Sequence, residues 1–148
     1  MGLFESLNIS ASGLSAERLR MDVISSNIAN ANSTETVRGG PYRRKIAVLA
    51  PQTGSENFRN VLQDSIKSKA PYSGVRVLGI MEDSTALKRI YDPQHPQASA
   101  DGYVEYPNVD VMKEMVELIT ASRSYEANVT AMNSTKSMFL KTLEIGRL

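Results

Sequence analysis

The amino-acid sequence predicts a mainly α-helical fold with a small β-containing insert, in which the N- and C-terminal helices pair as an antiparallel coiled coil. Apolar residues recur every seven positions near the start of the chain and again over its last forty residues. All six prolines lie between Pro41 and Pro107. The chain therefore divides into an N-terminal helix (1–33), a proline- and glycine-rich insert (34–107) and a long C-terminal helix (108–148).

The C-terminal helix has the strongest pattern. No proline interrupts Val109 to Leu148, and Asn108 or Asp110 can cap the start of the helix. Two series of seam positions, each with a seven-residue repeat, lie four residues apart, and a small polar residue, Ser122, and a charged one, Lys136, interrupt them. The residues expected to pack against a partner helix or a neighbouring subunit are Val111, Met115, Leu118, Tyr125, Val129, Met132, Phe139 and Leu143.

The N-terminal helix offers a matching seam. Leu7, Leu14, Met21 and Ile28 also recur every seven residues, and we expect them to pack in the same way. A cluster of asparagines around position 30 marks the end of this helix, because short amides compete for backbone hydrogen bonds. From the residues alone, nothing more than a helix terminus is expected there.

The insert carries three candidate strands. The first spans 42–49, and two more, at 74–81 and 87–91, are close enough in sequence to form a hairpin. Between the first two candidate strands, 52–74 is expected to be a loop with or without a short helix. The stretch 92–107 holds three prolines, so we expect it to be extended and ordered by side-chain contacts rather than by a strand ladder.

Composition argues against several classes of function. The formal net charge is +1, which does not favour nucleic-acid binding, and the chain has no cysteine for disulfides or thiol chemistry. No apolar run reaches the length of a membrane span, so direct membrane insertion is not expected. The N-terminus lacks a basic region followed by an apolar core, so a cleaved secretory signal is not expected either.

No catalytic or metal site is expected from the residue pattern. His95 is the only histidine and lies between prolines, which is typical of a structural loop residue. Glu114 and Glu117 are interpreted as the solvated face of a helix, and the cations at 43–45 as a solvated strand end. With no nucleophile-elbow or phosphate-loop motif, the sequence predicts neither an enzyme nor a bound cofactor.

Several motifs in order resemble those of the bacterial flagellar basal-body rod proteins. The segment 26–32 is similar to their N-terminal signature, 121–128 to the C-terminal signature of axial proteins, and 39–45 and 91–96 to the form found in a proximal rod member. The signature positions are Asn27, Ile28, Ala29, Asn30, Tyr125, Glu126 and Asn128. One departure is the extra residues at 35–38, where simpler members turn at once.

The resemblance implies a structural subunit of the proximal rod, which transmits torque and surrounds the export channel. It implies that the terminal helices form the inner layer of a helical tube, and that the insert contacts neighbours. The implied partners are other copies of the chain, neighbouring rod proteins and the flagellar type III export apparatus. The implied location is the basal-body rod crossing the periplasm, reached without a cleaved signal peptide.

The residues alone leave an alternative of another class. A soluble helical adaptor or export-chaperone-like module would also have two amphipathic helices around a small insert. The two hypotheses differ in what the helices do: an adaptor folds and acts in the cytoplasm, whereas a rod subunit orders its terminal helices on assembly. Apolar residues outside both seams favour assembly, because an isolated helix pair would leave them exposed.

Overall fold

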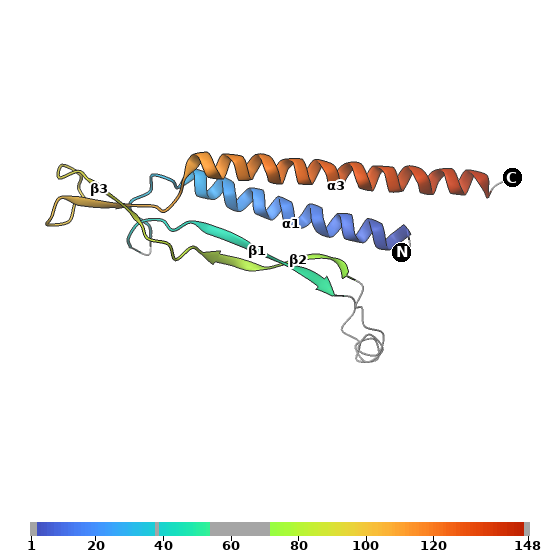
Figure 1. Ribbon diagram of the computed structural model, residues 1–148, viewed down its shortest axis with the longest axis horizontal. Coiled ribbons are helices and arrows are strands. Elements are labelled where there is room, and N and C mark those ends of the chain that lie inside the picture. The colour runs from blue at the N-terminus through green and yellow to red at the C-terminus, as the bar shows by residue number, and fades with distance from the viewer. Residues whose placement is uncertain (1–2, 38, 54–71, 147–148) are drawn as a thin grey trace. The chain divides into compact units, whose positions relative to one another are not determined.

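A computed structural model describes residues 3–37, 39–53 and 72–146 of the chain (Figure 1). The described residues form two long helices and four strands, with the strands between the helices in sequence. In chain order these are α1 (Leu3–Ala29), β1 (Lys45–Thr53), β2 (Tyr72–Glu82), β3 (Lys88–Tyr91), β4 (Tyr103–Tyr106) and α3 (Val111–Ile145). The prediction of a helical protein with a small β-containing insert is confirmed at this level.

Helix α1 runs without a break through the serine- and glycine-containing segment 10–13. Its end follows from the asparagine cluster, as expected. The Asn30 amide donates a hydrogen bond to the Ser26 carbonyl (2.8 Å), and the Asn30 backbone N–H donates to the same oxygen (3.1 Å). The side chain thus competes for a helical acceptor at the point where the helix ends.

Helix α3 begins after Asp110, which is its cap. The Asp110 carboxylate accepts a hydrogen bond from the backbone N–H of Met112 (3.1 Å), and its carbonyl accepts the first helical bond from Glu114 (2.9 Å). Of the two predicted caps, Asp110 is therefore the one used. Neither helix of the described part is long and apolar enough to cross a membrane.

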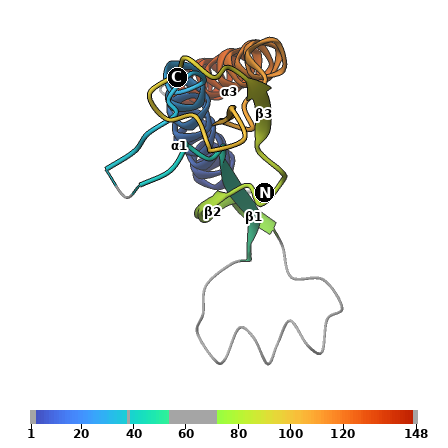
Figure 2. The same cartoon turned by 90° about the vertical axis from the view of Figure 1, so that its left-hand side faces the viewer.

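The strands pair differently from the prediction. Strand β2 lies beside β1 in one two-stranded sheet, with the arrows running in opposite directions, and Figures 1 and 2 agree on this arrangement. The expected hairpin between 74–81 and 87–91 is therefore wrong. A backbone hydrogen bond from Asp83 to the Arg44 carbonyl (2.7 Å) ties the end of β2 to the start of β1, which leaves β3 to find another partner.

That partner is β4, which the sequence analysis placed in a stretch without a ladder. Strand β3 pairs antiparallel with β4, from Lys88 opposite Tyr106 to Tyr91 opposite Tyr103. The proline-rich connection turns back on itself, and the Asp92 N–H donates to the Gly102 carbonyl (3.0 Å). Gly102 has a φ of +79°, a conformation that glycine adopts without strain, so the turn closes and the ladder forms.

The described chain forms two compact units, and each long helix contributes to both. One unit combines residues 1–18, 49–78 and 123–148, and here the rings of Phe4 and Phe139 meet edge to face with centroids 6.2 Å apart. The other combines 19–48 and 79–122. Its buried apolar core consists of Val23, Ile24, Tyr42, Val104, Val109 and Ala121.

The loop expected over 52–74 lies mostly outside the described residues. Gln52 and Thr53 belong to β1, and the segment from Tyr72 onward belongs to β2. The prediction for 54–71 is therefore not addressed by the structure.

Candidate functional site

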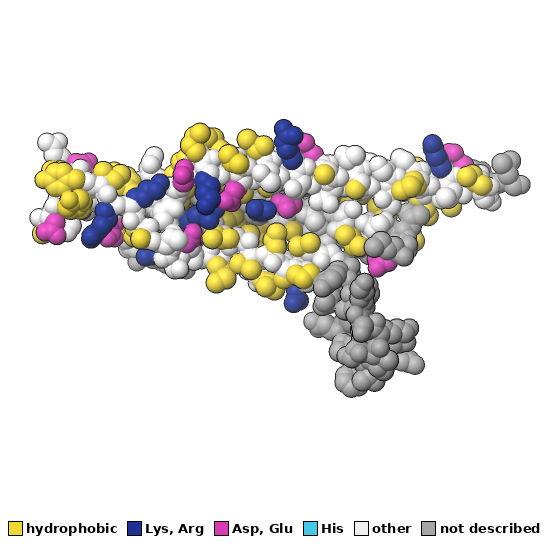
Figure 3. Space-filling view, viewed as in Figure 1, with side chains coloured by type: hydrophobic (Ala, Val, Ile, Leu, Met, Phe, Trp, Pro, Cys, Tyr) yellow, Lys and Arg dark blue, Asp and Glu magenta, His cyan; other side chains and the backbone are white. Residues whose placement is uncertain are grey.

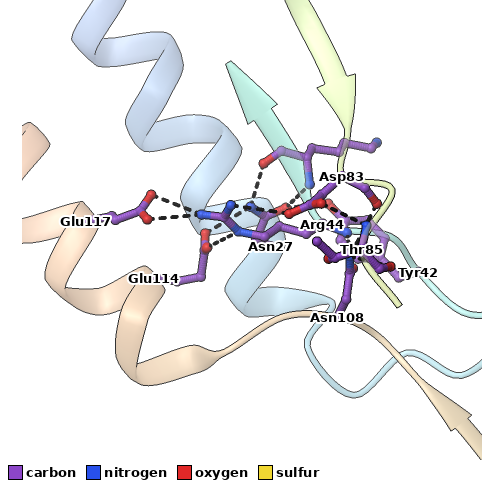
Figure 4. Close-up of polar contacts among 9 residues, drawn as sticks. Asn27, Tyr42, Arg44, Asp83, Thr85, Asn108, Glu114 and Glu117 are labelled. Carbon is purple, nitrogen blue, oxygen red and sulfur yellow. Dashed lines mark hydrogen bonds and ion pairs between the residues drawn. The ribbon is translucent and has the colours of Figure 1, made fainter. Parts of the chain in front are cut away.

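The most constrained group of side chains is a buried polar network in the unit formed by 19–48 and 79–122 (Figure 4). It joins the end of α1, the start of β1, the end of β2 and the first turns of α3. Asn27 and Glu114 are fully buried at its centre, although both side chains are strongly polar. Such groups are stable in a protein interior only when their hydrogen-bonding capacity is satisfied.

All the hydrogen-bonding capacity of the Asn27 side-chain amide is used. The Asn27 nitrogen donates to the Lys45 carbonyl (2.8 Å) and to the Glu114 carboxylate (2.9 Å). Its oxygen accepts from the Lys45 backbone N–H (2.9 Å) and from the Tyr42 hydroxyl (3.0 Å). The side chain thus pairs with both backbone groups of one β1 residue, which fastens α1 to the start of β1.

Arg44 pairs with two acidic residues in the first turns of α3, Glu114 and Glu117. Its Nε is 2.6 Å from a Glu114 oxygen, and its Nη2 contacts both oxygens of Glu117 at 3.1 Å. The Asp83 carboxylate lies 3.7 Å from Nη1. Burial lowers the pKa of Arg44, but the hydrogen bond and charge of Glu114, with the charges of Glu117 and Asp83, outweigh it, so the pKa is raised above its ordinary value.

Asn108 extends the network to the connection before α3. Its oxygen accepts from the Arg44 backbone N–H (2.8 Å), and its nitrogen donates to the Thr85 hydroxyl (2.7 Å) and the Asp83 carbonyl (3.3 Å). The pKa of Asp83 is lowered, first because its carboxylate accepts a hydrogen bond from the Thr85 backbone N–H (3.0 Å), and further by the Arg44 charge. Most contacts in this group hold separate segments together, which is a structural role.

Three interpretations from the sequence are wrong at this site. Glu114 is not on a solvated face, because it is fully buried, and Glu117 is bound to Arg44. Arg44 does not belong to a solvated strand end, since its side chain is only 14% exposed. Asn27 does more than end a helix. Its position was a usable signal, because Asn27 lies four residues after Val23 on the buried face of α1.

The expected seam residues differ in exposure. On α1, Leu7, Leu14, Met21 and Ile28 are all half-buried. On α3, Leu118, Tyr125, Val129 and Met132 are half-buried, whereas Val111, Met115, Phe139 and Leu143 are exposed. A Cβ at Gly13 would lie 3.1–3.3 Å from the side-chain atoms of Asn128, so the helices come close at this signature residue.

The other signature positions divide between buried and solvent-facing sites. Asn27 is buried, whereas Ile28, Asn30 and Tyr125 are half-buried. Ala29 and Glu126 are exposed. Within the N-terminal signature, Asn27 lies at the centre of the polar network, and the Ser26 hydroxyl lies 3.5 Å from that of Tyr42.

Large apolar side chains also face solvent. In the first turns of α3 an apolar stripe, defined as Met112, Met115, Val116 and Ile119, is 40–69% exposed, and Figure 3 shows yellow side chains gathered over this part of α3. On the β1–β2 sheet, Ile46, Leu78, Ile80 and Met81 are also exposed, on more than one face. Contiguous apolar surface of this kind marks sites of protein association.

The structure shows no metal-binding cluster of three or more histidine or acidic side chains in its described residues. His95 accepts a hydrogen bond from the Gln97 backbone N–H through Nδ1 (3.2 Å), and its ring lies near Tyr106. These contacts stay within the turn and its strand, as expected for a structural loop residue.

Comparison with known proteins identifies the family. Residues 7–35 match the model for flagella basal body rod proteins, and residues 100–145 match the C-terminal model of flagellar basal body rod FlgEFG proteins. The flagellar basal-body rod protein FlgC of Bacillus subtilis is 50% identical over 99% of this chain and 100% of its own length. The FlgC proteins of Borreliella burgdorferi and Escherichia coli O6:H1 are 46% and 41% identical, over 98% and 99% of this chain and 98% and 100% of their own lengths. The chain therefore belongs to the FlgC family of flagellar basal-body rod proteins and is a structural subunit of the rod.

Proposed function

We propose that this subunit forms part of the proximal rod wall by pairing α1 with α3 as an antiparallel coiled coil and by packing its exposed apolar surfaces against neighbouring subunits. In this proposal the helix pair lies in the inner layer of a helical tube around the export channel. The insert contacts neighbours, and the tube transmits torque. The role is structural, and the chain binds no cofactor.

Contacts between the two helices support their pairing. Phe4 meets Phe139 near the start of α1, Gly13 approaches Asn128 further along, and Asn27 bonds Glu114 near its end. Residue numbers thus rise on α1 while they fall on α3, in nearly equal steps. That order is what an antiparallel helix pair requires.

The exposed apolar stripe of α3 is the observation that best supports assembly with neighbouring subunits. Met112, Val116 and Ile119 are 69%, 63% and 57% exposed. Burying such side chains between subunits is favourable by roughly 25 cal/mol per Å² of apolar surface before the entropic costs of association. Head-to-tail contacts of one surface with a different one generate helical arrays, as a rod requires.

We further propose that the chain is exported unfolded by the flagellar type III apparatus, without a cleaved signal peptide, to a rod that crosses the periplasm. The absence of cysteine is compatible with that route. The adaptor alternative is not favoured, because the relatives that match this chain almost end to end are rod proteins by name.

The test is complementation of a strain that lacks its own copy of the gene. Ile119→Asp is expected to abolish swimming and to leave isolated basal bodies without a rod, because a buried charge opposes subunit packing. The variant chain is still expected in the periplasmic fraction, since export does not use this surface. Thr120→Asp is the matched control, because Thr120 is the exposed polar neighbour on the same helix and is expected to keep motility. Normal swimming with Ile119→Asp would overturn the proposed packing.

A further inference from the structure

The two heptad seams leave the alignment of the helices undetermined. Both α1 and α3 repeat their apolar residues every seven positions, and the observed contacts of Gly13 with Asn128 and of Asn27 with Glu114 lie beside these repeats. Sliding one helix past the other by seven residues, about 10 Å, brings each repeat back onto the same face of its helix. Hydrophobic packing alone therefore discriminates poorly between the observed register and one shifted by a heptad. A second element has to distinguish them.

We propose that the buried Asn27–Arg44–Glu114 group is the element that fixes the register of α1 against α3. This inference rests on the helix pairing of the proposed function and adds the residues that determine its alignment. Asn27 belongs to α1, and Arg44 directly precedes β1. Two hydrogen bonds between Asn27 and Lys45 tie α1 to the start of β1. Glu114 is the complementary group on α3, and it reaches both Asn27 and Arg44, at 2.9 Å and 2.6 Å.

A shift by one heptad separates these partners. In one direction Asn27 would face Ala121 in place of Glu114, and Glu114 would lie beyond the end of α1 at Ala29. In the other direction Asn27 would lie beyond the start of α3 at Val111. In either direction the ion pair between Arg44 and Glu114 is broken, and a buried charge without a partner is strongly unfavourable.

The group also has the chemistry of a specificity device rather than of a stability device. Replacing a buried ion pair by apolar residues of similar size is often neutral or stabilising, whereas a single buried polar residue can determine register in a coiled coil. The two roles therefore make different predictions for a variant in which the whole group is apolar. A stability device predicts that this variant is less stable, whereas a specificity device predicts that it loses the unique register of α1 and α3.

The chain contains no cysteine, so a pair of introduced cysteines reports register without background. Gly13→Cys with Asn128→Cys reports the observed register, because a Cβ at Gly13 lies 3.3 Å from the Asn128 Cγ. Gly13→Cys with Thr135→Cys reports a shift of seven residues along α3. Each pair is introduced into the full-length chain, which is oxidised both as purified protein and in isolated basal bodies. The intramolecular disulfide is then scored by mass spectrometry.

With the polar group intact, the in-register disulfide is expected to exceed the shifted one by at least about a hundredfold, because losing one partner of a buried ion pair is that costly. In the variant Asn27→Leu, Arg44→Met, Glu114→Met, the two disulfides are expected in similar yields while circular dichroism still shows helix. Should that variant fail to fold, Glu114→Gln, which keeps the side-chain shape, is expected to lower the ratio by about tenfold or more.

The outcomes are distinguishable. If the in-register disulfide fails to form with the polar group intact, both in the purified chain and in isolated basal bodies, the helix pairing of the proposed function is wrong, and the register inference fails with it. If that disulfide forms, and folded variants keep the same ratio, the pairing stands and the register inference alone is overturned.

Discussion

Arg44 Nε lies 2.6 Å from Glu114 Oε1, so a hydrogen-bonded ion pair joins the residue just before β1 to α3 across a separation of 70 residues. The Glu114 side chain is 1% exposed and that of Arg44 is 14% exposed. An ion pair this far from solvent makes the insert and the C-terminal helix depend on each other. It also means that removing Glu114 and removing Glu117, the other carboxylate bound to Arg44, have unequal effects on stability.

Removing Glu114 is expected to destabilise the chain much more than removing Glu117, although both carboxylates bind Arg44. Glu114→Ala leaves Arg44 and Asn27 without their buried partner and is expected to lower the free energy of unfolding by about 3–5 kcal/mol. Glu117, with 30% of its side chain exposed, is the matched control, and Glu117→Ala is expected to cost about 1 kcal/mol or less. Urea unfolding of the purified chain, followed by circular dichroism, measures both. Equal losses would show that burial does not distinguish the two carboxylates.

Acid is expected to weaken the unit that contains Asp83. Because the folded-state pKa of Asp83 is lowered, its ionised form stabilises the fold, and this contribution is fully present above about pH 4. It is lost as the pH falls through the lowered folded-state pKa. Asp83→Asn is therefore expected to be less stable than the parent at neutral pH and to lose less stability as the pH falls below about 4. Parallel acid-unfolding curves for the two proteins would contradict this, with Asp101→Asn as the control for removing one exposed carboxyl.

Gly74→Ala is expected to disturb the contact between β2 and α1. Gly74 has a φ of +132°, and an added Cβ would collide with the Ser12 hydroxyl oxygen, which accepts the Val75 N–H at 3.1 Å. The backbone strain alone is expected to cost about 1–3 kcal/mol. Gly79→Ala is the control, because Gly79 lies in the same strand and a Cβ there meets nothing within 4 Å. A thermal unfolding midpoint that falls only for Gly74→Ala agrees with the structure, and one that falls equally for both does not.

Charges in the predicted seam are expected to block assembly. Leu118 and Met132 are half-buried on α3, and an aspartate at either position would have to be desolvated between packed helices. Leu118→Asp and Met132→Asp are each expected to abolish swimming and rod formation while the chain is still exported. Electron microscopy of isolated basal bodies and periplasmic fractionation measure the two effects. Motility in both variants would argue that this seam does not build the rod.

The helices could be predicted from the sequence because their signal is local. A seven-residue repeat and the absence of proline are sufficient to indicate α1 and α3, and an aspartate at the right position indicates the cap at Asp110. Strand pairing is not local. The segments at β2 and β3 were correctly indicated as strands, but which partner each would choose depends on contacts such as Asp83 with Arg44.

The polar network was missed for a related reason. Asparagine, arginine and glutamate near helix ends are usually solvated, and composition cannot distinguish a solvated Glu114 from a buried one. The signal that could have found it is positional, because Glu114 lies seven residues before the buried Ala121 and Asn27 follows Val23 by four. Recognising that signal requires knowing which face of each helix is buried, and the predicted seams lie beside that face.

The central claim, that this rod subunit builds the wall by pairing α1 with α3 and packing their apolar surfaces, is tested most directly by cryo-electron microscopy of the assembled basal body at side-chain resolution. The account predicts α1 and α3 paired in the inner layer of the rod, with Met112, Val116 and Ile119 buried against a neighbouring subunit. Helices that lie apart in the rod, or an α3 stripe that still faces solvent after assembly, would contradict it.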